Sequence, residues 1–197
     1  MSDPSSIADR VRVREIKVLA DNWYILRKAI FEWRRNDGTW QTLEREAYDR
    51  GNGVGLLPYN LPRRTVILTR QFRYPAFSNG YDGLLVEVPA GLLDDADPET
   101  RIRLEVEEEI GYRLGDIRRV FEAFMSPGSV TERLHLFIAE YDHDMRVGDG
   151  GGLEGEGEEI GVMELSFDEA MAMVGDGRIC DAKTIMLLQH AALTVFA

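Results

Sequence analysis

Four glutamates, Glu105, Glu107, Glu108 and Glu109, lie close together near the middle of the sequence. On a helix, residues three and four positions apart are neighbours, so Glu105 would lie beside both Glu108 and Glu109. Like charges at that spacing destabilise a helix by roughly 0.2–0.5 kcal/mol per pair. A hard divalent cation such as Mg2+ would remove this repulsion, because it prefers carboxylate oxygens as ligands. A solvated acidic face is the alternative explanation.

The flanking residues predict a helix that ends just after the glutamates. Asp97 followed by Pro98 is typical of a helix start, because aspartate caps the first turn and proline needs no hydrogen-bond partner there. Gly111 is typical of the residue that follows a helix. Apolar residues recur every four positions within this segment and supply one buried stripe, formed by Ile102, Val106 and Ile110.

The segment before this helix predicts rigid support for the carboxylates. Residues 84–88 are predicted to form a buried strand, and residues 89–91 a tight glycine loop that leads to the helix. Glu105 and Glu109 flank the apolar stripe on one face, so they can converge on one point. Glu107 is expected to point off that face toward solvent. The sequence therefore predicts a metal site held by a strand, a loop and a helix.

Residues 91–112 resemble the Nudix box, G-x5-E-x7-R-E-U-x-E-E-x-G-U, in which U is an aliphatic or bulky apolar residue. The C-terminal half matches from Glu105 to Tyr112. Two features depart from the pattern: Leu104 stands where the box has arginine, and the spacing from Gly91 to Glu105 is one residue shorter. These departures concern the supporting ion pairs of the box and not its metal-binding glutamates.

The resemblance implies a metal-dependent hydrolase and assigns its metal-site residues. The expected ion is Mg2+, with Mn2+ as a substitute, and it would stabilise the phosphoryl oxygens and lower the pKa of a bound water. The implied metal ligands are Glu105, Glu108, Glu109, Glu158 and the backbone carbonyl of Ala90. The implied catalytic residues are Glu105, Glu109 and Glu158.

A second acidic cluster consists of Glu154, Glu156, Glu158 and Glu159. It overlaps and follows the glycine-rich segment of residues 148–157. It can be a flexible polar loop, or a lid that brings a carboxylate to the attacking water. In the Nudix family this loop delivers the catalytic glutamate. That resemblance favours Glu158 as the base or the last metal ligand, with Glu159 as the next candidate.

Segments outside the box resemble the GDP-mannose pyrophosphatase group, which is related to the ADP-ribose pyrophosphatases. They are E-R-E-A-Y-D-R-G-N-G at residues 44–53, R-Q-F-R at 70–73, S-P-G-S-V-T-E at 126–132 and the acidic glycine loop. The resemblance implies hydrolysis of a nucleoside-diphosphosugar, with GDP-mannose favoured, to GMP and mannose 1-phosphate. An ADP-ribose pyrophosphatase and a nucleotide-sugar sensor without catalytic activity are the alternatives.

Several further residues could contact this substrate. Arginines can make charge-assisted hydrogen bonds to phosphate, and a tryptophan can stack on guanine or belong to an apolar dimer core. Glutamates can accept from guanine N–H groups or sugar hydroxyls. Glu132 and Lys183 enter through the resemblance alone, and Arg50 and Glu87 are weaker candidates that would order the site. The predicted substrate-binding residues are Trp23, Glu44, Arg45, Glu46, Arg73, Ala90, Gly91, Leu92, Glu132 and Lys183.

Composition limits the classes of function. The chain has 197 residues and a formal net charge of −12, which argues against nonspecific binding to nucleic acid. Its one cysteine, Cys180, excludes an intramolecular disulfide. The sequence has no apolar run long enough to span a membrane, and its polar N-terminus is unlike a signal peptide. We therefore expect a soluble, cytoplasmic protein without membrane or nucleic-acid partners.

Strand patterns dominate the rest of the chain. We expect strands over residues 11–19, 23–33 and 40–48, with a hairpin turn at residues 36–38. Further strands are predicted over residues 53–59, 65–70, 116–125, 133–141 and 160–165, and helices over 167–174 and 183–195. This pattern indicates an α/β fold with a mixed sheet covered on both faces. The resemblance implies a Nudix α/β/α sandwich at residues 51–197. It also implies an N-terminal region, residues 1–50, whose small antiparallel sheet builds a homodimer.

Overall fold

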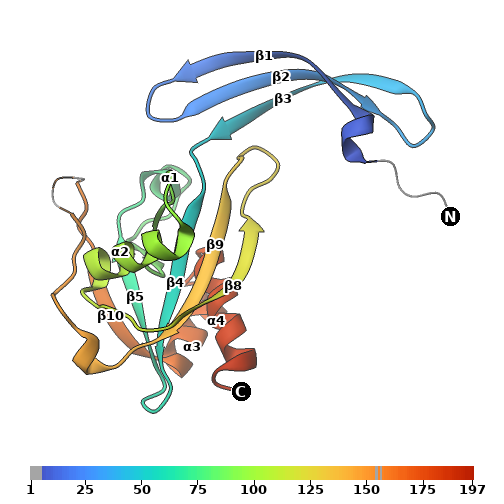
Figure 1. The fold of residues 1–197 in the computed structure, drawn as a ribbon. Helices are drawn as coiled ribbons and strands as arrows, with labels where there is room; N and C mark the ends of the chain where they lie inside the picture. The colour runs from blue at the N-terminus through green and yellow to red at the C-terminus, as the bar shows by residue number, and fades with distance from the viewer. Residues whose placement is uncertain (1–5, 154, 156) are drawn as a thin grey trace. The chain divides into compact units, whose positions relative to one another are not determined.

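The computed structural model describes residues 6–153, 155 and 157–197 (Figure 1). The contacts divide the chain into two units. Unit 1 contains Met1–Gly51 and Ser126–Glu132, and unit 2 contains Asn52–Met125 and Arg133–Ala197. The short segment Ser126–Glu132 thus belongs to the N-terminal unit, although it lies inside the range predicted for the Nudix domain.

Unit 1 is built on a three-stranded antiparallel sheet in the order β1-β2-β3. A short 3-10 helix, η1 (Ile7–Arg10), precedes β1 (Val11–Asp21), β2 (Ile25–Arg34) and β3 (Trp40–Asp49). The predicted hairpin turn is confirmed: Arg34 pairs with Trp40, and the Arg35 N–H donates to the Thr39 carbonyl at 2.8 Å. Gly38 has a φ of 85°, a conformation that glycine adopts without steric cost.

The Ser126–Glu132 segment is hydrogen-bonded to the end of β3. The Tyr48 N–H donates to the Ser129 carbonyl at 2.8 Å, and the Thr131 N–H donates to the Tyr48 carbonyl at 3.1 Å. The Thr131 hydroxyl also donates to Asp49 at 3.1 Å. These contacts explain why the segment belongs to unit 1.

Unit 2 contains a seven-stranded mixed sheet. Its main order is β10-β5-β4-β9-β8, with β6 paired to β5 and β7 paired to β4. β4 and β9 are parallel and the other pairs are antiparallel. The strands are β4 (Gly53–Asn60), β5 (Thr65–Gln71), β6 (Leu85–Glu87), β7 (Ala90–Leu92), β8 (Ile117–Phe124), β9 (Arg133–Glu140) and β10 (Gly161–Ser166).

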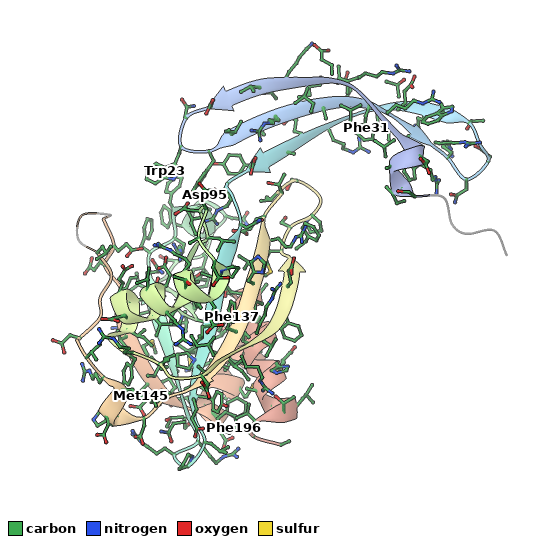
Figure 2. The ribbon with its side chains drawn as sticks, viewed as in Figure 1. Trp23, Phe31, Asp95, Phe137, Met145 and Phe196 are labelled. Atoms are coloured by element: carbon green, nitrogen blue, oxygen red, sulfur yellow. The ribbon has the colours of Figure 1, made fainter. Side chains whose placement is uncertain are left out.

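Helices cover both faces of this sheet, as predicted (Figure 1). They are α1 (Tyr74–Ser78), α2 (Pro98–Ile110), α3 (Phe167–Asp176) and α4 (Ala182–Thr194), with a 3-10 turn η2 (His143–Met145). Leu56 and Phe137 belong to the core formed with Ile102 of α2. Leu57 belongs to the core on the other face, together with Phe196 just beyond α4 (Figure 2). None of the described helices is long and apolar enough to span a membrane.

The ends of α2 confirm the sequence prediction. The Asp97 side chain accepts a hydrogen bond from the Thr100 N–H at 3.1 Å, and Pro98 occupies the first turn. Gly111 ends the helix in the left-handed conformation, with a φ of 74°. Ile102, Val106 and Ile110 are buried, as their spacing predicted.

Two local predictions need correction, and one short helix was not predicted. The strand expected from residue 23 begins at Ile25, because the two residues before it belong to the turn between β1 and β2. The loop expected at residues 89–91 instead contains the short strand β7, whose Gly91 pairs with Val54 of β4. Helix α1 was not predicted, since five residues are too few to show helical periodicity.

Candidate active site

The inward face of α2 carries two buried carboxylates. Glu105 is 6% exposed and Glu109 is 2% exposed, although both are ionisable. Glu108 lies partly exposed at the rim of this face. Glu107 points outward, as predicted, and a hydrogen bond from Arg113 at 2.6 Å lowers the pKa of its carboxyl. The helix therefore separates its four glutamates into inward-facing and outward-facing groups.

Arg101 is the supporting arginine of this helix. It forms an ion pair with Glu105 one turn later, and its Nε donates to the Leu92 carbonyl at 3.0 Å. Leu104, which stands where the Nudix box has arginine, is 47% exposed. Sequence analysis missed Arg101, although its spacing of four residues from Glu105 is a recognisable signal for such a pair.

Glycine at position 91 makes room for the Glu105 carboxylate. A Cβ atom at Gly91 would overlap the Glu105 carboxyl group. The Glu105 Oε1 atom is buried and has no hydrogen-bond partner among the described residues, although Arg101 lies beside it as an ion-pair partner. Arg101 is thus the partner of this oxygen within the described residues.

Glu109 is held by the strand that precedes α2. Its Oε2 atom accepts a hydrogen bond from the Ala90 N–H at 3.0 Å. Ala90 in turn pairs with Gly55 of β4 through the short strand β7. The backbone around Ala90 and the glutamates of α2 are therefore positioned together.

Burial opposes ionisation of both carboxylates. It raises the pKa of Glu105 to about 7, where the Arg101 charge lowers the pKa and the charges of Glu108 and Glu158 add to the rise. Burial also raises the pKa of Glu109 to about 8, against the hydrogen bond from Ala90 and with the charges of Glu105 and Glu158 adding to the rise. The inward face of α2 thus carries carboxylates that lack sufficient positive charge.

The glycine-rich loop packs against the C-terminal end of α2. The Gly151 N–H donates to the Glu109 carbonyl at 2.9 Å, and the Gly152 N–H donates to the Glu108 carbonyl at 3.1 Å. Gly150 has a φ of 68°, and a Cβ atom there would overlap the Glu109 carbonyl. These glycines allow the loop backbone to satisfy the last carbonyls of the helix.

Docking of this loop brings Glu158 close to the glutamates of α2. Its Oε2 atom accepts a hydrogen bond from the Leu153 N–H at 3.1 Å. Its charge contributes to the raised pKa of both Glu105 and Glu109. Glu159 is exposed. The other two acidic residues of the loop, Glu154 and Glu156, lie outside the described residues.

The donor set fits a hard divalent cation. Glu105 and Glu109 supply two buried carboxylates, and Arg101 is the ion-pair partner of the first. Carboxylate and carbonyl oxygens are the ligands that Mg2+ prefers, and a cation would offset the charge crowded at this face. Within the described part of the chain, no three His, Cys, Asp or Glu side chains converge as a complete metal-binding group. The described side chains thus offer two preformed carboxylates rather than a full ligand set.

A second buried charge network lies beside Ala90. Glu87 accepts a hydrogen bond from Arg73 Nε at 2.7 Å and forms an ion pair with Lys183. Lys183 also donates to Asp181 at 3.0 Å. The predicted substrate residues Arg73 and Lys183 are thus brought together through Glu87.

The remaining predicted substrate residues lie in unit 1. Trp23 is 84% exposed at the turn between β1 and β2 (Figure 2). Glu44 forms an ion pair with Lys28, and Arg45 donates to the Glu44 carbonyl at 2.7 Å. Glu46 is exposed on β3.

An aromatic and charged cluster also lies within unit 1. Glu132 lies 3.4 Å from Arg50, whose guanidinium is 5.6 Å from the centre of the Tyr24 ring. Tyr24 and Tyr48 meet edge to face, with ring centroids 5.8 Å apart. Sequence analysis missed this aromatic pair, because Tyr24 lies in the turn before β2 and Tyr48 lies 24 residues later on β3.

A family model for the NUDIX domain matches residues 49–188, which include every element of the site around α2. The chain belongs to the Nudix family. A second model, described as the GDP-mannose pyrophosphatase NudK N-terminal domain, matches residues 10–48. Members of the Nudix family generally depend on a divalent metal, which agrees with the donor set of α2. The predicted family is therefore confirmed.

Full-length relatives support this membership. A protein named GDP-mannose pyrophosphatase from Pectobacterium atrosepticum is 52% identical over 98% of this chain and 96% of its own length. Proteins with the same name from Klebsiella pneumoniae and Salmonella typhimurium are each 49% identical. The match to the Klebsiella protein covers 91% of this chain and 90% of that protein. The match to the Salmonella protein covers 88% of this chain and 91% of that protein.

A solved structure confirms the Nudix fold. The crystal structure of an ADP compounds hydrolase matches this chain with a TM-score of 0.67 and 15% sequence identity. The match covers 91% of this chain and 90% of that one. The predicted α/β/α Nudix fold with a small N-terminal antiparallel sheet is confirmed, whereas the role of that sheet in dimerisation stays a prediction.

Proposed function

We propose that this Nudix protein hydrolyses the pyrophosphate linkage of a nucleoside-diphosphosugar. The substrate is GDP-mannose, and the products are GMP and mannose 1-phosphate. The observation that carries the proposed reaction is the pair Glu105 and Glu109, which are buried together with raised pKa values and too little positive charge around them. The choice of substrate is supported by the name shared by relatives that match almost the whole chain.

The proposed metal is Mg2+, with Mn2+ as a substitute. Glu105, Glu109 and the Ala90 carbonyl would hold it, with Glu108 and Glu158 as additional ligands. When bound, the ion would neutralise phosphoryl oxygens and lower the pKa of a bound water. Arg101 keeps Glu105 oriented through their ion pair, and the Ala90 N–H keeps Glu109 oriented at 3.0 Å.

Glu158 is the proposed base that accepts the proton of the attacking water. The docked glycine loop supports this role, because it presents the Glu158 carboxylate from outside α2 while Glu105 and Glu109 stay fixed within the helix face. Arg73 is the proposed phosphate-binding residue of unit 2, since charge-assisted hydrogen bonds from a guanidinium suit phosphate oxygens. The contacts predicted for Trp23 stay a proposal, as do those for Glu44, Arg45, Glu46 and Glu132.

A homodimer built through the N-terminal sheet is also part of this proposal. Strand β1 exposes the apolar side chains of Val13, Ile16 and Val18, which a second copy of the chain could cover. Sedimentation velocity would test this, and a monomer at micromolar concentration would refute it. The proposed location is the cytoplasm.

A substrate panel tests the proposed reaction. Purified protein with Mg2+ is mixed separately with GDP-mannose, ADP-ribose and ADP-glucose, and nucleoside monophosphate release is followed by chromatography. We expect the highest kcat/KM with GDP-mannose. A preference for ADP-ribose would favour the alternative pyrophosphatase, and tight binding without turnover would favour a sensor. Glu109→Gln should abolish turnover with an unchanged circular dichroism spectrum, whereas Glu107→Gln, on the outward face of the same helix, should retain it.

A further inference from the structure

Glu87 is a buried carboxylate held between two cations. It is 3% exposed, and its two oxygens have different partners: Oε2 accepts from Arg73 Nε at 2.7 Å, and Oε1 is paired with Lys183 Nζ. Burial would raise the pKa of Glu87, but the charges of Lys183 and Arg73 hold it below its usual value. Glu87 therefore stays ionised and links the two cations.

Lys183 is paired with two carboxylates of the protein, those of Glu87 and Asp181. The Lys183 ammonium is buried and contacts Glu87 and Asp181, the latter at 3.0 Å. Burial would lower the pKa of Lys183, but these two carboxylates raise it. These two contacts use two of the three N–H donors of the ammonium and fix it beside Glu87.

The N-terminal end of α4 also fixes the backbone next to Glu87. Asp181 caps α4 by accepting from the Thr184 N–H at 3.0 Å and from the Thr184 hydroxyl at 2.6 Å. The same hydroxyl oxygen accepts from the Val88 N–H at 2.8 Å. Two residues further on, the Ala90 N–H donates to Glu109. The segment from Glu87 to Ala90 is thus held by α4 at one end and by α2 at the other.

The network fixes one edge of the Arg73 guanidinium. Its Nε donates to Glu87, and among the described residues its two Nη groups make no hydrogen bond. Burial would lower the pKa of Arg73, but the charges of Glu87, Glu109 and Asp181 raise it. Its partner Glu87 lies three residues before Ala90, whose N–H donates to Glu109 at 3.0 Å, so the guanidinium is held by the segment that also positions Glu109. The Arg73 side chain is also partly exposed.

We propose that Glu87 is a positioning residue, which fixes the Arg73 guanidinium beside Glu109 with its Nη edge directed to a substrate phosphate. Lys183 helps to fix Glu87 through their ion pair. This inference rests on the proposed function.

A double-mutant cycle tests this coupling. The variants are R73A, E87Q and R73A/E87Q, and kcat and KM are measured with GDP-mannose and Mg2+. We expect R73A and E87Q each to lower kcat/KM by about 10- to 100-fold, as expected for loss of a charge-assisted contact. Both variants should remove the same contact, that of Arg73 with the substrate phosphate, so they should change kcat and KM in the same proportions. The loss of kcat/KM in the double variant should therefore be no larger than in R73A. Losses that multiply in the double variant would overturn the proposal.

E164Q is a matched control, because Glu164 is also paired with an arginine, Arg63, at 3.0 Å but lies on β10 and has no proposed part in catalysis.

Two further measurements keep the proposal testable if a variant is unstable or the reaction differs. E87D keeps the charge but shortens the reach to Arg73, so it should fold where E87Q does not, and it should lower kcat/KM only when Arg73 is present. If the wild-type protein turns over no member of the panel, the proposed function fails and the cycle is repeated on the Kd for GDP-mannose. Independent effects on Kd, or no binding by the wild type, would overturn the positioning role.

Discussion

Glu109 should make the metal-free protein less stable as the pH rises, and Glu109→Gln should reduce that dependence to the part that Glu105 contributes. Burial is the main reason that its pKa rises from an ordinary value of 4.5 to about 8. Between these two values, the folded protein keeps a proton that the unfolded chain has released. Because the folded state binds more protons in this window, the free energy of unfolding falls as the pH rises from about 4.5 to about 8.

The size of this effect follows from the two pKa values. A rise from 4.5 to about 8 corresponds to at most about 5 kcal/mol, at about 1.36 kcal/mol per pH unit. Relaxation around the carboxylate and entry of water reduce such penalties, so we expect wild type to lose about 2–3 kcal/mol between pH 5 and pH 8. Glutamine at position 109 can still accept from the Ala90 N–H but carries no charge, so the variant should lose the contribution of Glu109. The smaller contribution of Glu105, whose pKa burial raises to about 7, should remain.

Urea unfolding in EDTA at several pH values between 5 and 8 measures the effect. Far-UV circular dichroism is the suitable probe, because all three tryptophans lie in unit 1 whereas Glu109 lies in unit 2. Glu107→Gln is the matched control: its ion pair with Arg113 lowers the pKa of Glu107, so this group does not titrate in the window. If wild type and Glu109→Gln showed the same pH dependence, the reasoning from burial would be refuted.

Three other perturbations probe the same site. Gly91→Ala places a Cβ against the Glu105 carboxylate and should lower kcat/KM by about 100-fold. Gly115→Ala is the control and should leave kcat/KM unchanged, because a Cβ there would meet no atom within 4 Å. Equal activity of the two variants would contradict the tight fit around Gly91. Gly150→Ala combines a φ of 68° with overlap onto the Glu109 carbonyl and should lower stability by about 1–3 kcal/mol, measured as a drop in Tm that Gly128→Ala does not show. Mg2+ at about 100 times its Kd should stabilise wild type by about 2.7 kcal/mol and Glu105→Gln or Glu109→Gln by much less, as followed by Tm; equal shifts would place the metal elsewhere.

Sequence analysis succeeded where the determining interactions are local. The cap at Asp97, the proline after it and Gly111 define α2 within one segment, and the burial of Glu105 and Glu109 follows from their position beside the apolar stripe. The alternation of apolar residues similarly indicated most strands of the sheet. These features depend on neighbours fewer than about five residues away, which a single sequence displays directly.

The remaining features depend on contacts between distant segments. The Val88 N–H meets the Thr184 hydroxyl across 96 residues of sequence, so nothing local indicates that α4 fixes the backbone near Ala90. The position of Lys183 in a strand-to-helix ion pair was also hidden, and the family resemblance alone suggested a substrate contact. Similarly, the glycines of the acidic loop suggested a flexible loop or a lid, and nothing local indicated that Gly150 approaches α2 closely.

The docked loop and the glutamates of α2 together indicate that this region is arranged for binding rather than for stability. The last turn of α2 has no basic residue to offset the negative end of its dipole, and the loop supplies backbone N–H groups there instead. The same loop adds the charge of Glu158, which raises the pKa values of Glu105 and Glu109 further. A fold selected only for stability would place a lysine or arginine at this position. The accumulation of negative charge against a buried helix face is therefore best explained by a cation that binds there during function.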